Sequence, residues 1–326
     1  MKLIGLEEHW CPRELFEEEG TPGYASVAMT KGILSPEQFE LSVRSISDIG
    51  AERIAMMDAV GLDTQVLSLT NALMEQLPDE DAVRYSRMSN DILAKGMAAS
   101  EGRLRGFAAI PTGAPEQAAE EMQARAEQDG FVGVVVSGHV RGHYLDEPRF
   151  EPILVASERL RMPIYIHPAL PPKAVAQTYY SIASPYGARV LASGGWGWHI
   201  ETGVHVLRLI ASGAFDRHPD LQVIVGHLGE GLPFFMQRLE NAADPALERP
   251  YFEYLKTNVS YTISGFHDPD LLEFVMRKVG ADRIMFSTDY PFNQPEKEIE
   301  AFLAAPIDDA SKQLIAHGNA ERMLRL

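Results

Sequence analysis

Cysteine is almost absent from this sequence, and its absence excludes two kinds of site. Cys11 is the single cysteine among 326 residues, so it has no second thiol with which to form an internal disulfide or a cysteine-type zinc site. Long apolar runs are also missing, and the acidic Glu7 and Glu8 interrupt the amino terminus before a signal-peptide stretch could develop. We therefore expect a cytoplasmic protein with no membrane partner.

Positive charge is scarce as well. The sequence has 29 Lys and Arg residues against 46 Asp and Glu residues, which gives a formal net charge of −17. A field of this sign repels phosphate backbones, so nucleic acid is not an expected partner. With 45% hydrophobic and 23% charged residues, the composition is otherwise typical of a globular protein, and no repeat or linker divides the chain.

Short apolar runs rich in β-formers alternate with helical stretches along the chain. Eight runs predict strands, at residues 2–9, 64–69, 104–110, 133–137, 163–167, 221–227, 258–264 and 284–289. Helices are predicted at residues 36–59 with a break at Ile49-Gly50, and at 81–100, 115–128, 148–160, 199–212, 232–242, 269–279 and 295–304. Eight strands in one alternating series predict an α/β fold, a single (β/α)8 TIM barrel over residues 1–326.

Two long stretches fall outside this alternation. Pro12–Leu34 follows the first predicted strand and Pro168–Gly197 follows the fifth, and both are rich in Gly, Pro, Ser and Tyr. Loops that follow the strands of a barrel form its catalytic face. We therefore expect long active-site loops after strands 1 and 5.

Side chains that can bind a metal fall where the predicted strands end. Glu7 and His9 close the first strand, and His167, His227 and Asp289 end the fifth, sixth and eighth. Residues i and i+2 of a strand point to the same side, so Glu7 and His9 face one space. Each residue alone could be an ordinary polar group at a loop. Together they form a mixed carboxylate and imidazole set that suits a catalytic zinc or manganese ion.

A glycine-rich turn and a pair of tryptophans add candidates for substrate contact. In GHLGEGLPF the small residues allow His227 to project into the barrel mouth, where Glu230 could accept its other ring N–H and fix the tautomer. This describes an acid–base or substrate-binding histidine better than a fifth metal ligand, with plain turn chemistry as the alternative. Trp196 and Trp198 in GGWGWH predict either a lid over an aromatic ligand or core packing.

Several segments resemble the decarboxylase branch of the amidohydrolase superfamily. They are LEEHW, GHYLDEPRFEPIL, PIYIHPALPP, WGWHIETGVHVLRLIASGAFDRHPDLQVIVGHLGEGLPF, GADRIMFSTDYPF and HGNAERMLRL. Together they cover nearly the whole chain. The sequence resembles gamma-resorcylate and 2,3-dihydroxybenzoate decarboxylases and, more distantly, aminocarboxymuconate semialdehyde decarboxylase.

The resemblance implies a division of roles. One divalent ion, zinc or manganese, would be held by Glu7, His9, His167 and Asp289. The ion would chelate the carboxylate and ortho hydroxyl of a small carboxylic acid substrate, and Asp289 would protonate the ring carbon as carbon dioxide leaves. His227, supported by Glu230, would contact the substrate, and so would Arg238, whose planar fork suits a carboxylate. The resemblance also implies a homodimer or homotetramer.

Two segments depart from the family pattern, and a rival function uses the same scaffold. SLTNALMEQL lacks the usual Pro-Gly pair, and SGFHDPDLL replaces the usual SGNFR, so that His267 could contact substrate or merely flank a helix. The sequence predicts a carbon–carbon lyase, a metal-dependent non-oxidative decarboxylase of a hydroxylated aromatic or related unsaturated carboxylic acid. The alternative is a hydratase or hydrolase in which His227 activates water, and a non-catalytic binding barrel is a third reading.

Overall fold

The computed structural model describes residues 1–15, 21, 35–70, 74–241 and 244–326. Its centre is one sheet in which eight parallel strands pair in sequence order: β1 (Ile4–Trp10), β2 (Thr64–Leu69), β3 (Leu104–Ala109), β4 (Phe131–Ser137), β5 (Ile164–His167), β6 (Val223–Val225), β7 (Val259–Thr262) and β8 (Ile284–Met285). Between the first and last strands, Leu6 N donates to Phe286 O at 3.0 Å. The sheet therefore forms a nearly closed barrel, and the predicted (β/α)8 fold is confirmed.

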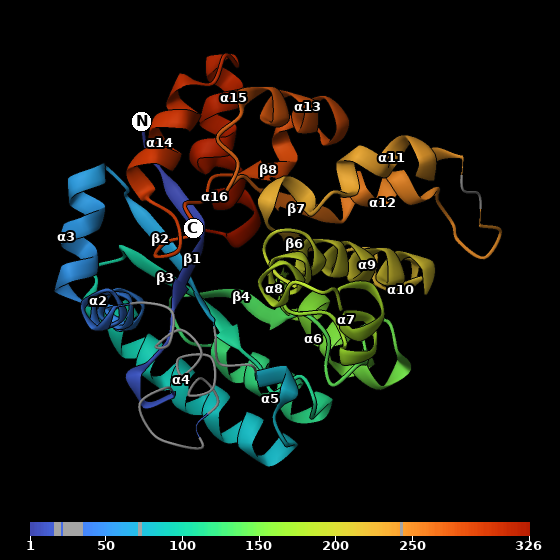
Figure 1. Ribbon diagram of the computed structural model, residues 1–326, viewed down its shortest axis with the longest axis horizontal. Coiled ribbons are helices and arrows are strands. Elements are labelled where there is room, and N and C mark those ends of the chain that lie inside the picture. The colour runs from blue at the N-terminus through green and yellow to red at the C-terminus, as the bar shows by residue number, and fades with distance from the viewer. Residues whose placement is uncertain (16–20, 22–34, 71–73, 242–243) are drawn as a thin grey trace.

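Helices surround this barrel on its outer side (Figure 1). The main ones are α2 (Pro36–Ser47), α3 (Ala51–Val60), α4 (Asp79–Ala99), α5 (Pro115–Ala126), α6 (Glu151–Leu160), α9 (Gly197–Ala211), α11 (Leu232–Glu240), α13 (Pro269–Val279) and α14 (Pro295–Ala304). The predicted break at Ile49-Gly50 lies between α2 and α3. Within the described residues, four short helices lie outside every predicted helix and loop: α10 (Ala214–Arg217), α12 (Tyr251–Thr257), α15 (Asp309–Gln313) and α16 (Asn319–Leu324). None of the described helices has both the length and the apolar character needed to cross a bilayer.

The buried side chains form two apolar layers, one on each side of the sheet. The larger layer packs the outward strand positions against the helices. The smaller cluster consists of Ile4, Leu6, Val66, Phe107, Val135, Tyr165, Ile224 and Met285, with Ala320 and Leu324 of α16 packed against them. Its members come from seven of the strands, as expected for side chains that fill the interior of a barrel. Two positions after Tyr165, the same strand face carries His167, so the interior becomes polar toward the carboxyl ends of the strands.

Several strands, β6 and β8 among them, end earlier than predicted, and one predicted loop contains helices. β6 ends at Val225 and β8 at Met285, so His227 and Asp289 lie in the loops beyond these strands. After β8, Thr288 N donates to the carboxylate of Glu8 instead of extending a strand ladder. The stretch after the fifth strand includes α7 (Lys173–Tyr179) and α8 (Pro185–Ala192). Most of the predicted loop after the first strand, residues 12–34, lies outside the described residues.

Candidate metal centre and active site

Four side chains predicted as metal ligands lie together at the carboxyl ends of the strands. One ligand atom each from Glu7, His9 and His167 lie within 4.8 Å of one another. The imidazole centroids of His9 and His167 are 4.8 Å apart in an edge-on arrangement. Asp289 completes the group, because its Oδ1 lies 2.9 Å from Nε2 of His9. Strands β1, β5 and the loop after β8 thus direct two carboxylates and two imidazoles at one space.

The ring of His9 shows that this space fits a cation. Its Nδ1 and Nε2 are both buried and have no hydrogen-bond partner among the described residues, even though Asp289 Oδ1 is close. An unsatisfied buried polar atom costs about 1–3 kcal/mol. A divalent ion would remove that cost, since two ligands that each lie about 2.1 Å from one ion come within roughly 3 Å of each other. Burial, together with the nearby His9, lowers the pKa of His167 to about 3, so this imidazole is neutral and keeps a lone pair for a metal.

Glu7 is fixed in place by three hydroxyl groups. Its Oε1 accepts a hydrogen bond from Tyr165 at 2.5 Å, and its Oε2 accepts bonds from Thr262 and Ser264 at 2.5 Å each. Burial raises the pKa of this carboxyl, but His227 and the two histidines of the cluster outweigh burial and lower the pKa to about 2. The side chain is therefore a charged, rigidly oriented carboxylate at the centre of the barrel mouth.

The room for Glu7 depends on a glycine in the turn after β6. A Cβ atom added to Gly226 would lie 2.5 Å from Glu7 Oε1, and the φ of Gly226 is −78°, so the constraint is steric rather than conformational. We expect Gly226→Ala to displace the carboxylate and weaken metal affinity by about 10- to 100-fold. Metal titration of the chelated protein measures this effect. Gly318→Ala is the matched control, because its nearest added contact is 3.5 Å; equal affinity in both variants would contradict the prediction.

A second cluster beside the metal centre joins two histidines through one carboxylate. His227 Nδ1 lies 2.8 Å from Glu230 Oε1, and His199 Nδ1 bonds the other oxygen of Glu230. The two imidazole centroids are 4.9 Å apart. Since a carboxylate only accepts, both Nδ1 atoms carry the proton, and His227 keeps Nε2 for another partner. The cluster is therefore a hydrogen-bonded pair of oriented imidazoles rather than a set of free lone pairs that could hold a second ion.

Charge couples this second cluster to the metal centre. His227 Nδ1 lies 3.6 Å from Glu7 Oε1. Burial alone lowers the pKa of His227, but the carboxylates of Glu7 and Glu230 outweigh burial and raise the pKa to about 10. These carboxylates therefore favour the protonated imidazolium at neutral pH, which can donate a hydrogen bond to an anionic ligand at the barrel mouth.

The backbone of the turn after β6 is left-handed over five consecutive residues. The φ angles are 50° at His227, 55° at Leu228, 91° at Gly229, 54° at Glu230 and 82° at Gly231. A left-handed conformation costs roughly 1–2 kcal/mol at each non-glycine position, so the surrounding packing must hold the turn in this shape. This conformation allows the side chains of His227 and Glu230, which are three positions apart, to point toward each other. Asp289 also has a positive φ, of 57°.

His199 belongs to this site although sequence patterns gave it no partner. It lies near the start of α9, and Trp198 Nε1 donates to its Nε2 at 3.2 Å. The partner carboxylate of His199 is Glu230, which is 31 positions away, so no local spacing could have signalled the contact. Trp198 is thus linked to the His227 cluster, whereas Trp196 is 52% exposed.

The buried Glu8 supports the metal centre from the opposite side of β1. Thr288 donates to its carboxylate from the backbone nitrogen at 2.8 Å and from the hydroxyl at 2.6 Å, and Gln65 Nε2 donates at 2.9 Å. Arg53 donates to the carbonyl oxygen of His9 at 2.8 Å. Burial raises the pKa of Glu8 to about 8. These contacts fix the backbone at His9 and at Thr288, which directly precedes Asp289.

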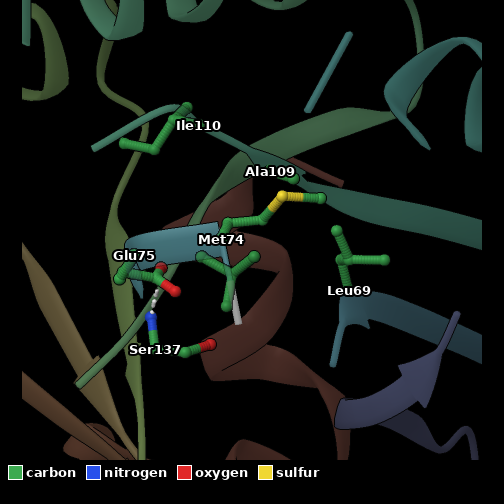
Figure 2. Close-up of a pocket in the computed structure, with 7 residues that line it drawn as sticks. Leu69, Met74, Glu75, Ala109, Ile110 and Ser137 are labelled. Carbon is green, nitrogen blue, oxygen red and sulfur yellow. Dashed lines mark hydrogen bonds between the residues drawn. The ribbon is translucent and has the colours of Figure 1, made fainter. Parts of the chain in front are cut away.

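A small cavity lies at the carboxyl ends of β2, β3 and β4 (Figure 2). Glu75 reaches into its wall and accepts a hydrogen bond from Ser137 N at 2.7 Å, as the dashed line in Figure 2 shows. Ser137 pairs in register with His167, so this cavity is on the same face of the barrel as the metal centre. Its volume of about 10 Å³ leaves room for about one water molecule and none for an aromatic acid.

Glu75 makes the stability of the protein depend on pH. Burial raises its pKa from 4.5 to about 7, so the folded protein retains this proton over that pH range. Its stabilising contribution is complete below about pH 4.5 and is lost as the pH rises through 7. Relative to wild type, we expect Glu75→Gln to gain about 3 kcal/mol in the free energy of unfolding between about pH 5 and pH 8.5. Urea unfolding across this range measures the gain, and the exposed Glu116→Gln should show none.

The remaining predicted contacts lie at the edge of the site or outside it. Arg238 is exposed on α11 and has no hydrogen-bond or ion-pair partner among the described residues, so its role as an anion clamp stays a prediction. His267 bonds Glu298 at 2.8 Å, and 49% of its side chain is exposed. Glu298 also accepts from Gly265 N at 3.3 Å, which places His267 in a network beside the loop after β7. The structure shows no contact from His267 to the four metal-ligand candidates within the described residues.

The barrel is parallel and nearly closed, and carboxylates and imidazoles converge at the carboxyl ends of its strands. These features place the chain in the class of metal-binding (β/α)8 proteins. A family model described as Amidohydrolase matches residues 33–326. The chain is 33% identical over 339 residues to the gamma-resorcylate decarboxylase of Rhizobium sp. (strain MTP-10005), covering 99% of this chain and 98% of that relative. The chain belongs to the amidohydrolase family, on its decarboxylase branch.

Solved structures of relatives superpose on this chain over its full length. A 2,6-dihydroxybenzoate decarboxylase complexed with 2,6-dihydroxybenzoate matches with a TM-score of 0.89 and 33% identity, over 100% of both chains. A dihydroxybenzoic acid decarboxylase from Polaromonas sp. JS666 matches with a TM-score of 0.89 and 32% identity, covering 100% of this chain and 97% of that one. That structure contains manganese and the inhibitor 2-nitroresorcinol.

Proposed function

We propose that this chain is a metal-dependent, non-oxidative decarboxylase of an ortho-hydroxylated aromatic acid. The observation that carries the proposal is the convergence of Glu7, His9, His167 and Asp289 on one space at the barrel mouth. The full-length similarity to relatives that act on dihydroxybenzoates supports this substrate class. Manganese is the metal we would supply first, because a structural relative contains it.

The four side chains would hold one divalent ion between them. When bound, such an ion supplies positive charge that stabilises anionic oxygens and orients a carboxylate with its neighbouring hydroxyl. Glu7, His9 and His167 are suited to holding the ion without transferring a proton. Glu7 is fixed by three hydroxyls, and the two imidazoles lie beside it on β1 and β5. Asp289 lies at the edge of this group and is the residue that remains for proton transfer.

In the proposed reaction, protonated Asp289 delivers its proton to the ring carbon that carries the carboxylate. The bond between that carbon and the carboxylate then breaks, its electron pair returns to the ring, and carbon dioxide leaves. The ring thus gains a hydrogen where it loses the carboxyl group, so no oxidant or organic cofactor is required. Asp289 must then recover a proton from solvent; its side chain is 14% exposed, which permits this exchange.

His227 would bind and orient the substrate from the other side of the site. Glu230 holds its Nδ1, which leaves Nε2 to donate a hydrogen bond to a carboxylate or phenolate oxygen. His199 holds the second oxygen of Glu230 and so prevents this carboxylate from rotating. The same histidine could instead act as a base on water, which is how the alternative hydratase or hydrolase would work.

Product analysis in heavy water separates these two functions. We expect the manganese-loaded protein to convert 2,6-dihydroxybenzoate into carbon dioxide and resorcinol that carries one deuterium at the carbon that lost the carboxylate. Catechol acids and muconate-type acids, tested in the same way, define the substrate range. A product that has gained water, or turnover of lactones and amides without carbon dioxide, would favour the hydratase or hydrolase.

A further inference from the structure

A large cavity lies on the face of the barrel opposite the candidate active site. Its volume is about 490 Å³, within the range of small-molecule sites. Arg161, Arg283, Arg322 and Arg325 contribute to its lining. Arg161 lies three residues before the start of β5, and Arg283 directly precedes β8. Arg322 lies in α16 and Arg325 just after it. Because these segments lead into the strands, the cavity is at their amino-terminal ends, whereas the metal ligands are at the carboxyl ends.

The charge of this cavity is opposite to that of the molecule as a whole. The chain has a formal net charge of −17, yet four arginines meet here. None of the four forms an ion pair with a carboxylate among the described residues, in contrast to paired arginines elsewhere such as Arg208 with Asp146. Two carboxylates, from Glu158 and Asp220, also line the cavity, so positive charge remains in excess. The oxygens of Glu158 are used by His218 and by the backbone nitrogen of Asp220.

Neutral groups fix the arginine side chains without cancelling their charge. Arg283 donates from Nε to Val259 O and from Nη2 to Gln222 Oε1, at 2.9 Å each. Arg322 Nη2 donates to Asp282 O at 2.6 Å, and Arg325 Nη2 donates to Leu160 O at 3.1 Å and Arg161 O at 3.0 Å. A guanidinium has five N–H donors, so each of the three retains donors for another partner.

Burial adds an energetic reason for an anionic partner. Burial lowers the pKa of Arg283; Tyr261 and Asp282 offset this in part, the neighbouring Arg322 adds to it, and the pKa stays below its ordinary value. A bound anion would offset both effects. Planar guanidinium groups bind phosphate and carboxylate oxygens in pairs, with hydrogen bonds stronger than those between neutral groups.

We infer that this arginine-lined cavity binds a small oxyanion that carries at least two negative charges, such as inorganic phosphate or a phosphate ester. The site is separate from the metal centre and does not depend on the proposed decarboxylase activity. Its location at the amino-terminal ends of the strands leaves the catalytic face unobstructed. The cavity is large enough for an organic group attached to the phosphate, so a phosphate ester should bind more tightly than the free ion if the ester is the natural ligand.

Calorimetric titration of the manganese-loaded protein with inorganic phosphate tests this inference. We expect saturable binding that weakens at least 10-fold in the double variant Arg322→Gln/Arg325→Gln. The double variant Arg84→Gln/Arg277→Gln is the matched control: it removes the same charge from two surface ion pairs, with Asp81 and Glu273, and should bind phosphate like wild type. Thermal unfolding of each variant verifies that it is folded.

The outcomes distinguish specific binding by the arginines of the cavity from nonspecific attraction of phosphate to positive surface charge. Binding that is absent in wild type, or that weakens equally in both double variants, would overturn the inference. Binding that both double variants retain in full would place the phosphate at the catalytic ion and would also overturn it. Arg283→Lys gives an independent test, because it keeps the charge but loses the planar fork; it should weaken phosphate binding several-fold. A parallel titration with a sugar phosphate distinguishes an ester from the free ion.

Discussion

Asp289→Asn is expected to lower kcat by at least about 100-fold, because the asparagine amide cannot deliver a proton to the ring carbon. The substitution keeps the size of the side chain and the left-handed backbone conformation that Asn tolerates well. The Nε2 atom of His9, 2.9 Å from Oδ1, would still face an oxygen or amide nitrogen. Carbon dioxide release from 2,6-dihydroxybenzoate, measured at saturating substrate, gives the change in kcat.

Two controls make the Asp289 result specific. Asp309→Asn, on the exposed face of α15, removes the same charge at a remote site and should leave kcat unchanged. Because the substitution replaces one of the four ligand candidates, Asp289→Asn is assayed at saturating manganese, and its metal content and unfolding midpoint are measured on the same sample. A bound ion and an unchanged midpoint would separate lost proton transfer from a lost ion. Retention of most of the activity in metal-loaded Asp289→Asn would remove this residue as the proton donor.

Removal of the divalent ion is expected to abolish turnover, and manganese should restore it. The structure gives two reasons for so large an effect. The ring nitrogens of His9 are buried without a hydrogen-bond partner among the described residues, and the carboxylates of Glu7 and Asp289 lie close to the same space. Without a metal ion, the carboxylates of Glu7 and Asp289 would repel an incoming carboxylate, and the single imidazole of His227 beside Glu7 offsets only part of that charge.

The metal-removal experiment uses dialysis against a chelator, followed by stepwise addition of manganese. Activity should rise in proportion to bound metal and level off at one ion per chain, while the unfolding midpoint rises with occupancy. Zinc added in the same way shows whether the site discriminates between the two ions. Full activity in protein shown to be free of metal would contradict a metal-dependent mechanism.

Much of the site could be predicted because strand periodicity determines where side chains point. Glu7 and His9 are two residues apart at the end of β1, and the ends of parallel strands meet at one face of a barrel. His167 joins them for the same reason. The three-residue spacing of His227 and Glu230 was also visible, although their contact depends on a left-handed turn that spacing alone does not specify.

The parts that sequence reasoning missed depend on contacts between distant segments. His199 reaches the site through Glu230, 31 positions later, and the backbone of Thr288 is held by Glu8, 280 positions earlier. The latter contact also explains why β8 is shorter than its apolar run predicted. The two helices after β5 lie in a stretch whose glycines and prolines suggested a plain loop. Local propensity is a weak guide where tertiary contacts decide the backbone path.

The most direct test of metal-dependent decarboxylation measures metal content and carbon dioxide release on the same preparation. The protein is analysed for bound metals and then assayed with 2,6-dihydroxybenzoate and other ortho-hydroxybenzoates. We expect one divalent ion per chain and release of carbon dioxide from at least one of these acids, in proportion to the ion bound. A fully loaded protein that releases no carbon dioxide from any of them would contradict the decarboxylase proposal and favour a reaction in which His227 activates water.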